Sequence, residues 1–232
     1  MAAETCVITG ASRGIGLATA LRFARGGRQV VMAARTEADL AAGTKEVLAA
    51  GGRCAHVVAD VGTRAGAQRV IDVALKTFGR IDVLVNNAGA APLSPIERMS
   101  DDDFEQALRA NIAGVFYMTR AAWPALRRQG SGTVVNISSL AAVDPFPGFA
   151  VYGACKAWVS LFTKAADDEG RPLGIRVFAI APGAVETAML RQNFPDIPAE
   201  QTLAPDEVAG MIEAVCEPRA SHASGQTIFI RK

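Results

Sequence analysis

The segment Thr-Cys-Val-Ile-Thr-Gly-Ala-Ser-Arg-Gly-Ile-Gly, residues 5–16, predicts a strand that runs through a tight glycine turn into a helix. Glycines let a phosphate approach the backbone closely, and the N-terminus of a helix points its free N–H groups at the anion. The segment therefore predicts a cradle for the pyrophosphate of a dinucleotide. Its expected contacts are Gly10, Ser12, Arg13, Gly14, Ile15 and Gly16.

The glycine spacing leaves a second interpretation open. The spacing is Gly-x-x-x-Gly-x-Gly, whereas the commonest dinucleotide fingerprint is Gly-x-Gly-x-x-Gly. On its own it also fits a glycine-rich turn that binds no ligand. The strand before the glycines and the helix after them favour the cradle.

Short, continuously apolar segments alternate with longer amphipathic segments along the rest of the chain. Apolar runs rich in Val and Ile are typical of parallel strands that helices cover on both faces. This alternation predicts right-handed βαβ units in a single doubly wound, Rossmann-type α/β domain over residues 1–232. Strands are expected at residues 5–9, 29–34, 53–59, 81–86, 133–138, 175–180 and 226–230, and helices at residues 14–25, 37–50, 64–78, 102–128, 150–169 and 205–216.

Composition and charge exclude several classes of protein. The 232 residues carry a net charge of +1, which gives no reason to expect a nucleic-acid partner. The four cysteines lie far apart and only two histidines are present, so neither a metal site nor a disulfide framework is expected. The sequence contains no run of the roughly 18 apolar residues that a membrane span needs, and no apolar signal run opens it. We therefore expect a cytoplasmic protein with no membrane segment.

The end of the second predicted strand bears on the choice of cofactor. An acidic residue about 20 positions after the glycines would bind the ribose 2′-hydroxyl of NAD. The chain has Arg35 at this place and no acid before Glu37. Because a guanidinium binds phosphate well, Arg35 favours NADP(H) over NAD(H), with Arg13 as a second cation in the cradle. The alternative is that Arg35 is a solvated residue at a strand end.

Tyr152 and Lys156 lie four residues apart in a segment that predicts a helix, so they share one helix face. A neighbouring positive charge favours the phenolate and is expected to lower the Tyr152 pKa from its ordinary value of about 10. The pair therefore predicts a proton donor and acceptor that works near neutral pH. Taken alone, it also fits an ordinary Tyr–Lys pair on the surface.

Further motifs follow the glycine turn in a fixed order. They are Asp60-Val61, Asn86-Asn87-Ala88-Gly89, Asn111, Ser139, Tyr152 with Lys156, and Pro182-Gly183. Together they resemble the short-chain dehydrogenase/reductase family over residues 5–230, and most closely its 3-oxoacyl-carrier-protein reductases. The resemblance implies a seven-stranded sheet in the order 3-2-1-4-5-6-7.

The resemblance also implies contacts with a nicotinamide cofactor. Asp60 would bind the adenine amino group, and Val61 would pack on the adenine ring. Asn87 would steady the central strands, and Gly89 beside Ala88 would leave room for the cofactor. The contacts at the nicotinamide end would be Tyr152, Lys156, Pro182, Gly183, Val185 and Thr187.

The reaction that the resemblance implies interconverts a carbonyl and a secondary alcohol, with Tyr152 as general acid and base. Lys156 would lower the Tyr152 pKa and bind the nicotinamide ribose, and Asn111 would hold a water that connects Lys156 to solvent. Asn111 also fits a polar residue that breaks the long helix, as in the family, and the two roles are compatible. Ser139 would donate a hydrogen bond to the substrate oxygen. Ser138 is the alternative, but Ser139 has the family spacing before Tyr152, and adjacent strand residues face opposite ways.

Apolar segments at residues 90–93 and 140–149, with a short lid at residues 188–204, are expected to form the substrate pocket. Their composition favours an apolar ketone, although ordinary packing explains the same residues. A 3-oxo thioester on an acyl carrier or on CoA is the alternative substrate. The basic residues that an acidic carrier would need near the pocket are Arg127, Arg128 and Arg171, and the acids at residues 167–169 oppose them.

The helices predicted at residues 102–128 and 150–169 carry more apolar residues than one buried face needs. In the family these helices pair across a two-fold axis, so a homodimer or homotetramer is expected. A nucleotide-sugar epimerase or dehydratase is a less favoured enzyme, because such enzymes are longer. A non-enzymatic NADPH-binding sensor or scaffold is the alternative of another class, which the full set of catalytic residues disfavours.

Overall fold

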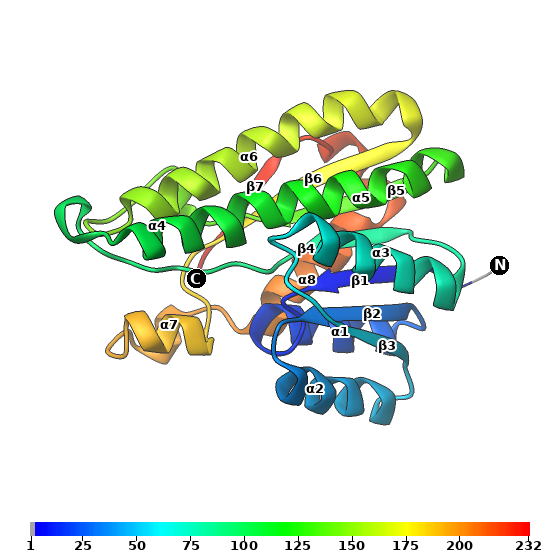
Figure 1. The fold of residues 1–232 in the computed structure, drawn as a ribbon, viewed down its shortest axis with the longest axis horizontal. Helices are drawn as coiled ribbons and strands as arrows, with labels where there is room; N and C mark the ends of the chain where they lie inside the picture. The colour runs from blue at the N-terminus through cyan, green and yellow to red at the C-terminus, as the bar shows by residue number, and fades with distance from the viewer. Residues whose placement is uncertain (1–2) are drawn as a thin grey trace.

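The computed structural model describes residues 3–232, and it confirms the predicted architecture (Figure 1). Seven strands form one parallel sheet in the order β3-β2-β1-β4-β5-β6-β7. Their bounds differ from the predicted ones by no more than two residues. The strands are β1 (Thr5–Thr9), β2 (Gln29–Ala34), β3 (Arg53–Val58), β4 (Val83–Asn86), β5 (Gly132–Ile137), β6 (Ile175–Pro182) and β7 (Thr227–Ile230).

Helices cover both faces of this sheet, as the continuously apolar strands predict (Figure 1). The α-helices are α1 (Gly14–Arg25), α2 (Glu37–Ala49), α3 (Arg64–Phe78), α4 (Asp101–Leu108), α5 (Gly114–Gln129), α6 (Ala150–Gly170), α7 (Ala188–Asn193) and α8 (Pro205–Cys216). On β1, Cys6 and Ile8 pack toward α1, α2 and α8, whereas Val7 packs toward α3, α5 and α6. Within residues 3–232, none of the helices is long and apolar enough to cross a membrane.

The order in which successive strands are added to the sheet reverses at β1, and this places the crevice. Cys6 is paired with Val30 of β2 on one side and with Val83 of β4 on the other. The connections that leave β1 and β4 therefore diverge, and they open a crevice at the carboxyl ends of these strands. The glycine turn and the Asn86–Gly89 segment both lie at this end of the sheet.

The helix predicted at residues 102–128 is interrupted. It divides into α4, a π-helical turn η2 (Arg109–Ala113) and α5. Asn111 explains the interruption, because its buried amide Nδ2 donates to the Ala107 carbonyl at 2.9 Å and to the Ala90 carbonyl at 2.7 Å. A side chain that bonds a helix carbonyl in this way replaces a backbone donor, which is a common cause of a π-bulge.

Two groups of short helical segments were not predicted. Helix α7 begins after Thr187, whose hydroxyl accepts a hydrogen bond from the Leu190 N–H at 3.2 Å and caps the helix. The 3₁₀ turns are η1 (Ile96–Arg98), η3 (Leu140–Ala142), η4 (Arg171–Leu173), η5 (Ala199–Gln201) and η6 (Pro218–Ala223). They lie in connections whose sequences have no helical apolar period.

A buried carboxylate fixes the C-terminal segment to the sheet. Asp167 of α6 is fully buried, and it accepts hydrogen bonds from the Val177 N–H at 3.0 Å, the Ser224 hydroxyl and the Arg171 guanidinium. Burial alone would raise the Asp167 pKa, but these three bonds together hold the pKa below its ordinary value of 3.8. One side chain thus joins α6, β6 and the approach to β7.

We expect Asp167→Asn to lower the free energy of unfolding by on the order of 2 kcal/mol at pH 7, because the amide cannot satisfy the same three donors. Since the Asp167 pKa is depressed by folding, the stabilisation is present above pH 4 and is lost as the pH falls through the folded pKa. Urea unfolding at several pH values measures it, and the difference from wild type should shrink below pH 4. Asp168→Asn is the control, since Asp168 is exposed and pairs only with Lys164 at 3.3 Å; an equal loss in both variants would contradict the assignment.

Candidate active site

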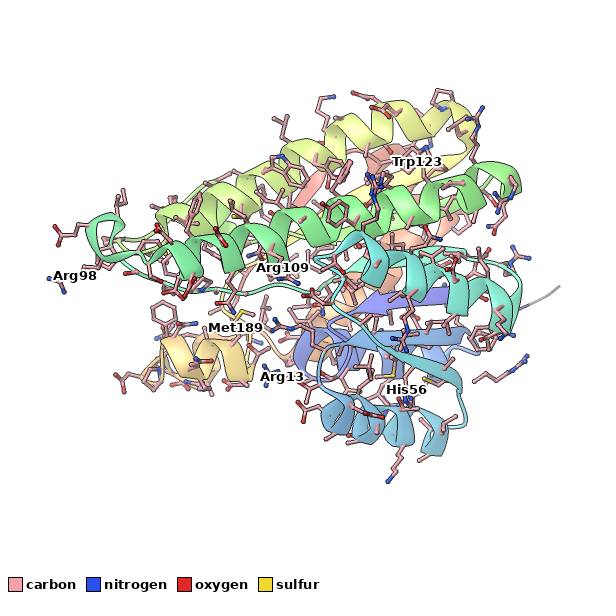
Figure 2. The ribbon with its side chains drawn as sticks, in the orientation of Figure 1. Arg13, His56, Arg98, Arg109, Trp123 and Met189 are labelled. Carbon is pink, nitrogen blue, oxygen red and sulfur yellow. The ribbon has the colours of Figure 1, made fainter. Side chains whose placement is uncertain are left out.

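A cavity of about 600 Å³ opens at the carboxyl ends of the strands. Residues of the loops after β1 to β6 line it, together with η2 and α7. Figure 2 shows Arg13, Arg109 and Met189 around it, from the glycine turn, η2 and α7 respectively. The cavity brings together the predicted site residues Gly10, Ser12, Arg13, Gly14, Ile15, Arg35, Asp60, Val61, Asn87, Ala88, Gly89, Asn111, Ser139, Tyr152, Lys156, Pro182, Gly183, Val185 and Thr187.

Gly16 is the predicted contact that does not line this cavity. A Cβ atom on Gly16 would lie 2.3 Å from the Gly10 carbonyl oxygen and 2.6 Å from Asn87 Nδ2. The role of Gly16 is therefore to let α1 pack closely behind the turn rather than to touch a ligand. Gly10 does line the cavity, and it has a φ of +62°, which favours glycine.

Asn87 joins the two central strands, as expected. Its Nδ2 donates to the carbonyls of Thr9 at 2.9 Å and Gly10 at 3.1 Å. The Thr9 hydroxyl in turn accepts from the backbone N–H groups of Asn87 and Ala88, each at 3.0 Å. These bonds fix the glycine turn against the end of β4.

Asp60 has a partner that sequence reasoning missed. One carboxylate oxygen accepts from the Gly62 N–H at 2.9 Å, and the other pairs with Arg109 Nη2 at 2.6 Å. Arg109 begins the π-helical turn, far from Asp60 in the chain, and its side chain is 56% exposed. The pair leaves the Asp60 carboxylate held from two sides at the wall of the cavity. A lone arginine in a helix carries no motif, so only the fold reveals it.

Arg13 and Arg35 lie at the same end of the cavity as Asp60, which we call the cofactor half. Within residues 3–232, neither guanidinium has an acidic side chain within 4.0 Å. Asp39 of α2 also lines this half and lowers its positive charge. Two guanidinium groups without an acidic partner in this range therefore lie beside the glycine turn. Such an arrangement can bind an anion.

Helix α6 presents Tyr152 and Lys156 on consecutive turns at the other end of the cavity. Lys156 Nζ lies 5.6 Å from the centroid of the Tyr152 ring and donates to the Ile137 carbonyl at 2.9 Å. Lys156 is buried, and burial lowers its pKa from 10.5 to about 8. The pair therefore faces the cavity, and the interpretation as a surface pair is wrong.

The expected direction of the Tyr152 pKa is also wrong. Burial raises the Tyr152 pKa above its ordinary value of 10, and a hydrogen bond with Ser139 opposes this rise without cancelling it. The desolvation of the phenol therefore outweighs the Ser139 hydrogen bond. Tyr152 remains a protonated phenol through the neutral range, which suits a group that donates a proton.

The structure distinguishes the two serines at the end of β5. The Ser138 hydroxyl donates to the Lys156 carbonyl at 2.9 Å and is bonded to the Ser160 hydroxyl at 2.9 Å, so it holds α6 against the sheet. Ser139 instead faces Tyr152, with which it forms a hydrogen bond, and its oxygen also accepts the Ala141 N–H at 3.2 Å. Ser139 is therefore the serine whose hydroxyl lies beside Tyr152, and its hydrogen bond to a substrate oxygen stays a prediction.

Asn111 contributes an unsatisfied acceptor next to Lys156. Its Nδ2 is fully used in the π-helical turn, whereas its buried Oδ1 has no hydrogen-bond partner among the described residues. A Cβ atom on Gly89 would lie 2.8 Å from this oxygen and 3.5 Å from Lys156 Nζ, so both groups border the space that Gly89 leaves open. A buried polar atom of this kind indicates a site for a water or a ligand hydroxyl.

The geometry defines a dinucleotide-binding α/β protein with a Ser–Tyr–Lys group beside the dinucleotide site. The sequence profile of the short chain dehydrogenase family matches residues 4–198, and the chain belongs to this family of oxidoreductases, which bind nicotinamide cofactors. No group of three or more His, Cys, Asp or Glu side chains in residues 3–232 is placed to hold a metal ion.

The names of similar proteins refer to several classes of substrate. The chain is 38% identical to a 3-oxoacyl-[acyl-carrier-protein] reductase of Synechocystis, covering 99% of this chain and 96% of the relative. It is 36% identical to 3beta-hydroxysteroid dehydrogenase 1 of Eggerthella lenta, covering 98% and 92% respectively. Among solved structures, a variant of actinorhodin polyketide ketoreductase with NADPH superposes with a TM-score of 0.94 at 30% identity, covering 100% of this chain and 98% of that one.

Proposed function

We propose that the protein is an NADPH-preferring oxidoreductase that interconverts a ketone and a secondary alcohol, with Tyr152 as the general acid and base. One observation carries this proposal. One end of the cavity is bordered by Ser139, Tyr152, Lys156 and the unbonded Oδ1 of Asn111. The other end is a glycine turn beside two arginines that form no ion pair among the described residues. The location expected for such an enzyme, the cytoplasm, is part of the same proposal.

The cavity fits a nicotinamide dinucleotide. The glycine turn would hold the pyrophosphate, because Gly10 and Gly14 have positive φ and leave the backbone exposed to the cavity. Asp60 and Val61 would hold the adenine, while Val185 and Thr187 would hold the nicotinamide carboxamide. When bound, the reduced cofactor supplies a hydride to the carbonyl carbon of the substrate.

The residues of the chain then provide the proton and the charge stabilisation. Tyr152 donates its phenolic proton to the carbonyl oxygen as that oxygen gains negative charge, and Ser139 donates a hydrogen bond to the same oxygen. The ketone thus gains a hydride at carbon and a proton at oxygen. Lys156 stabilises the phenolate that remains, and a water at Asn111 Oδ1 passes a proton back toward Lys156. The reverse sequence oxidises an alcohol.

The preference for NADPH rests on Arg35, with Arg13 as the second cation. We expect Arg35→Asp to lower the NADPH/NADH ratio of kcat/KM by about 50-fold, because it replaces a charge-assisted hydrogen bond to the 2′-phosphate with repulsion. Steady-state kinetics with both cofactors measure the ratio. Arg25→Asp is the control for the same charge change, since Arg25 is exposed and does not line the cavity. An unchanged ratio in Arg35→Asp would refute the assignment.

Two other functions remain as competitors. One is the same chemistry on 3-oxo thioesters of an acyl carrier or CoA, which the Synechocystis relative's name favours. The other is an NADPH-binding sensor without turnover. Oxidation of NADPH or NADH with a panel of ketones, diketones and acyl thioesters separates the three. Cofactor binding without turnover across the whole panel would support the sensor and refute the enzyme.

We also propose a homodimer or homotetramer. Phe116 of α5 and Leu161 of α6 are 39% and 70% exposed, and the rings of Phe116, Phe162 and Trp158 form a continuous aromatic group across the two helices. Exposed aromatic surface of this kind is typical of an interface. Sedimentation velocity tests the assembly, and a monomer at micromolar concentration would refute it.

A further inference from the structure

We propose that Phe149 and Phe194 form an aromatic clamp that selects uncharged ketones carrying a flat apolar ring system, and that Arg191 positions this clamp. The proposal rests on the proposed ketone reduction and specifies its substrate. The part of the cavity bordered by Leu93, Leu140, Phe146, Phe149, Met189, Leu190, Phe194 and Ile197 is called the substrate half.

The clamp lies directly beside the catalytic phenol. The Phe149 ring stacks on Phe194 of the lid, with centroids 5.7 Å apart and planes 26° apart. The same ring meets Tyr152 edge-on, with centroids 5.9 Å apart and planes at 77°. Phe149 is also the N-cap residue of α6, directly before Ala150 and three residues before Tyr152. A substrate whose carbonyl reaches Tyr152 therefore has its ring system against Phe149, where face and edge contacts favour a flat apolar group.

The charges around the cavity exclude anionic substrates from the substrate half. Among the described lining residues the cations are Arg13, Arg35 and Arg109, which lie in the cofactor half, and Lys156 at the catalytic pair. The acid at the substrate half is Asp144. A substrate with a phosphate or carboxylate would lose water there and gain no cationic partner. An uncharged ketone has no such cost.

Arg191 holds the lid in the position that brings the two rings together. Its guanidinium forms a two-point pair with the Glu186 carboxylate, in which Nε donates at 2.7 Å. Its Nη1 donates to the carbonyls of Pro195 at 3.0 Å and Ile197 at 2.6 Å. These two carbonyls follow Phe194 in the chain, so Arg191 folds the segment after α7 back and fixes the position of Phe194. Hydrogen bonding by Arg191 also lowers the Glu186 pKa, so the pair stays charged in the neutral range.

The test compares 2-tetralone, a flat fused-ring ketone, with 2,3-butanedione, a small acyclic one. We expect wild type to prefer 2-tetralone in kcat/KM, and Phe194→Ala to lower kcat/KM for 2-tetralone by about tenfold, mainly through KM. The value for 2,3-butanedione should change by less than about twofold. Phe194→Leu keeps most of the apolar volume and should also lose the preference for 2-tetralone over 2,3-butanedione. Because Leu still fills the space of the ring, a folding defect would not explain the loss in this variant. Phe229→Ala is the control, because Phe229 is an exposed phenylalanine of β7 outside the cavity.

Arg191 has its own test as a positioning residue. Arg191→Gln should raise KM for 2-tetralone as much as Phe194→Ala does. The kcat at saturating substrate and the NADPH affinity should not change. Arg191→Lys keeps the charge but not the two-point geometry, so it should restore KM only in part. A rise in KM of equal size for 2,3-butanedione would overturn this role.

The outcomes separate the clamp from the proposed function. A preference for acetoacetyl-N-acetylcysteamine, a 3-oxo thioester, over 2-tetralone would overturn the clamp while ketone reduction stands. Equal losses for both ketones in Phe194→Ala would also overturn it. Failure of every ketone and thioester to oxidise NADPH, despite measured NADPH binding, would overturn the proposed function itself.

Discussion

Replacing Tyr152 with phenylalanine is expected to lower kcat for ketone reduction by about 10²–10⁴-fold while the fold and NADPH affinity are retained. The variant lacks only the phenolic oxygen. The variant keeps the ring, which packs edge-on against Phe149, so the position of α6 should not change. The substrate oxygen then loses its proton donor, and Ser139 cannot replace it, because an aliphatic hydroxyl is a much weaker acid than a phenol. Stopped-flow or steady-state oxidation of NADPH measures the loss.

The chain contains one other tyrosine, which provides the matched control. Tyr117 of α5 contacts Phe116 and Arg120 and does not line the cavity. Tyr117→Phe should therefore retain kcat within about twofold. Since burial raises the Tyr152 pKa, wild-type reduction should be flat through neutral pH and fall only on the alkaline side. Turnover by Tyr152→Phe within tenfold of wild type would contradict the assignment of Tyr152.

The fold could be predicted because its signals are local. Each strand is a short apolar run, and each of the helices at residues 14–25, 64–78 and 205–216 has ends that the structure reproduces. The break of the long helix at Asn111 is what the family resemblance implies. The hydrogen bond from Asn111 to the Ala90 carbonyl could not be predicted from the sequence, because Ala90 lies in the loop after β4. A short helix such as α7 could not be predicted either, since its six residues are too few to show the apolar period of a helix.

The site shows the same division between local and non-local signals. Motif spacing predicted a set of site residues, and all of them except Gly16 line one cavity. Spacing also favoured Ser139 over Ser138, whose hydroxyl is bonded to the Lys156 carbonyl. It could not show the Arg109 partner of Asp60, because the pair joins two loops that only the sheet brings together. It also gave the wrong direction for the Tyr152 pKa, because spacing reports a neighbouring charge but not the extent of burial.

Lys156→Met is expected to have two opposite effects, a loss of activity and a gain in stability. Activity should fall by about 10²–10³-fold, because the phenolate of Tyr152 loses the cation that stabilises it. The cofactor-free protein should become more stable by on the order of 2 kcal/mol at pH 7, since a buried ammonium with a pKa of about 8 is costly. The lost hydrogen bond to the Ile137 carbonyl reduces this gain but does not cancel it.

The pH dependence of this gain identifies its cause. The Lys156 pKa is lower in the folded chain, about 8, than its ordinary value of 10.5. The unfolded chain therefore binds the proton more strongly, and wild type loses stability as the pH falls from 10.5 to 8. The Lys156→Met variant does not lose this stability. Its free energy of unfolding should therefore exceed that of wild type by the full amount below pH 8, and the difference should disappear near pH 10.5. Chemical denaturation across this range measures it. Lys164→Met is the control on the same helix, since Lys164 is exposed and paired with Asp168. A variant at position 156 that is less stable than wild type at pH 7 would show that the ammonium contributes more by its hydrogen bond than its burial costs.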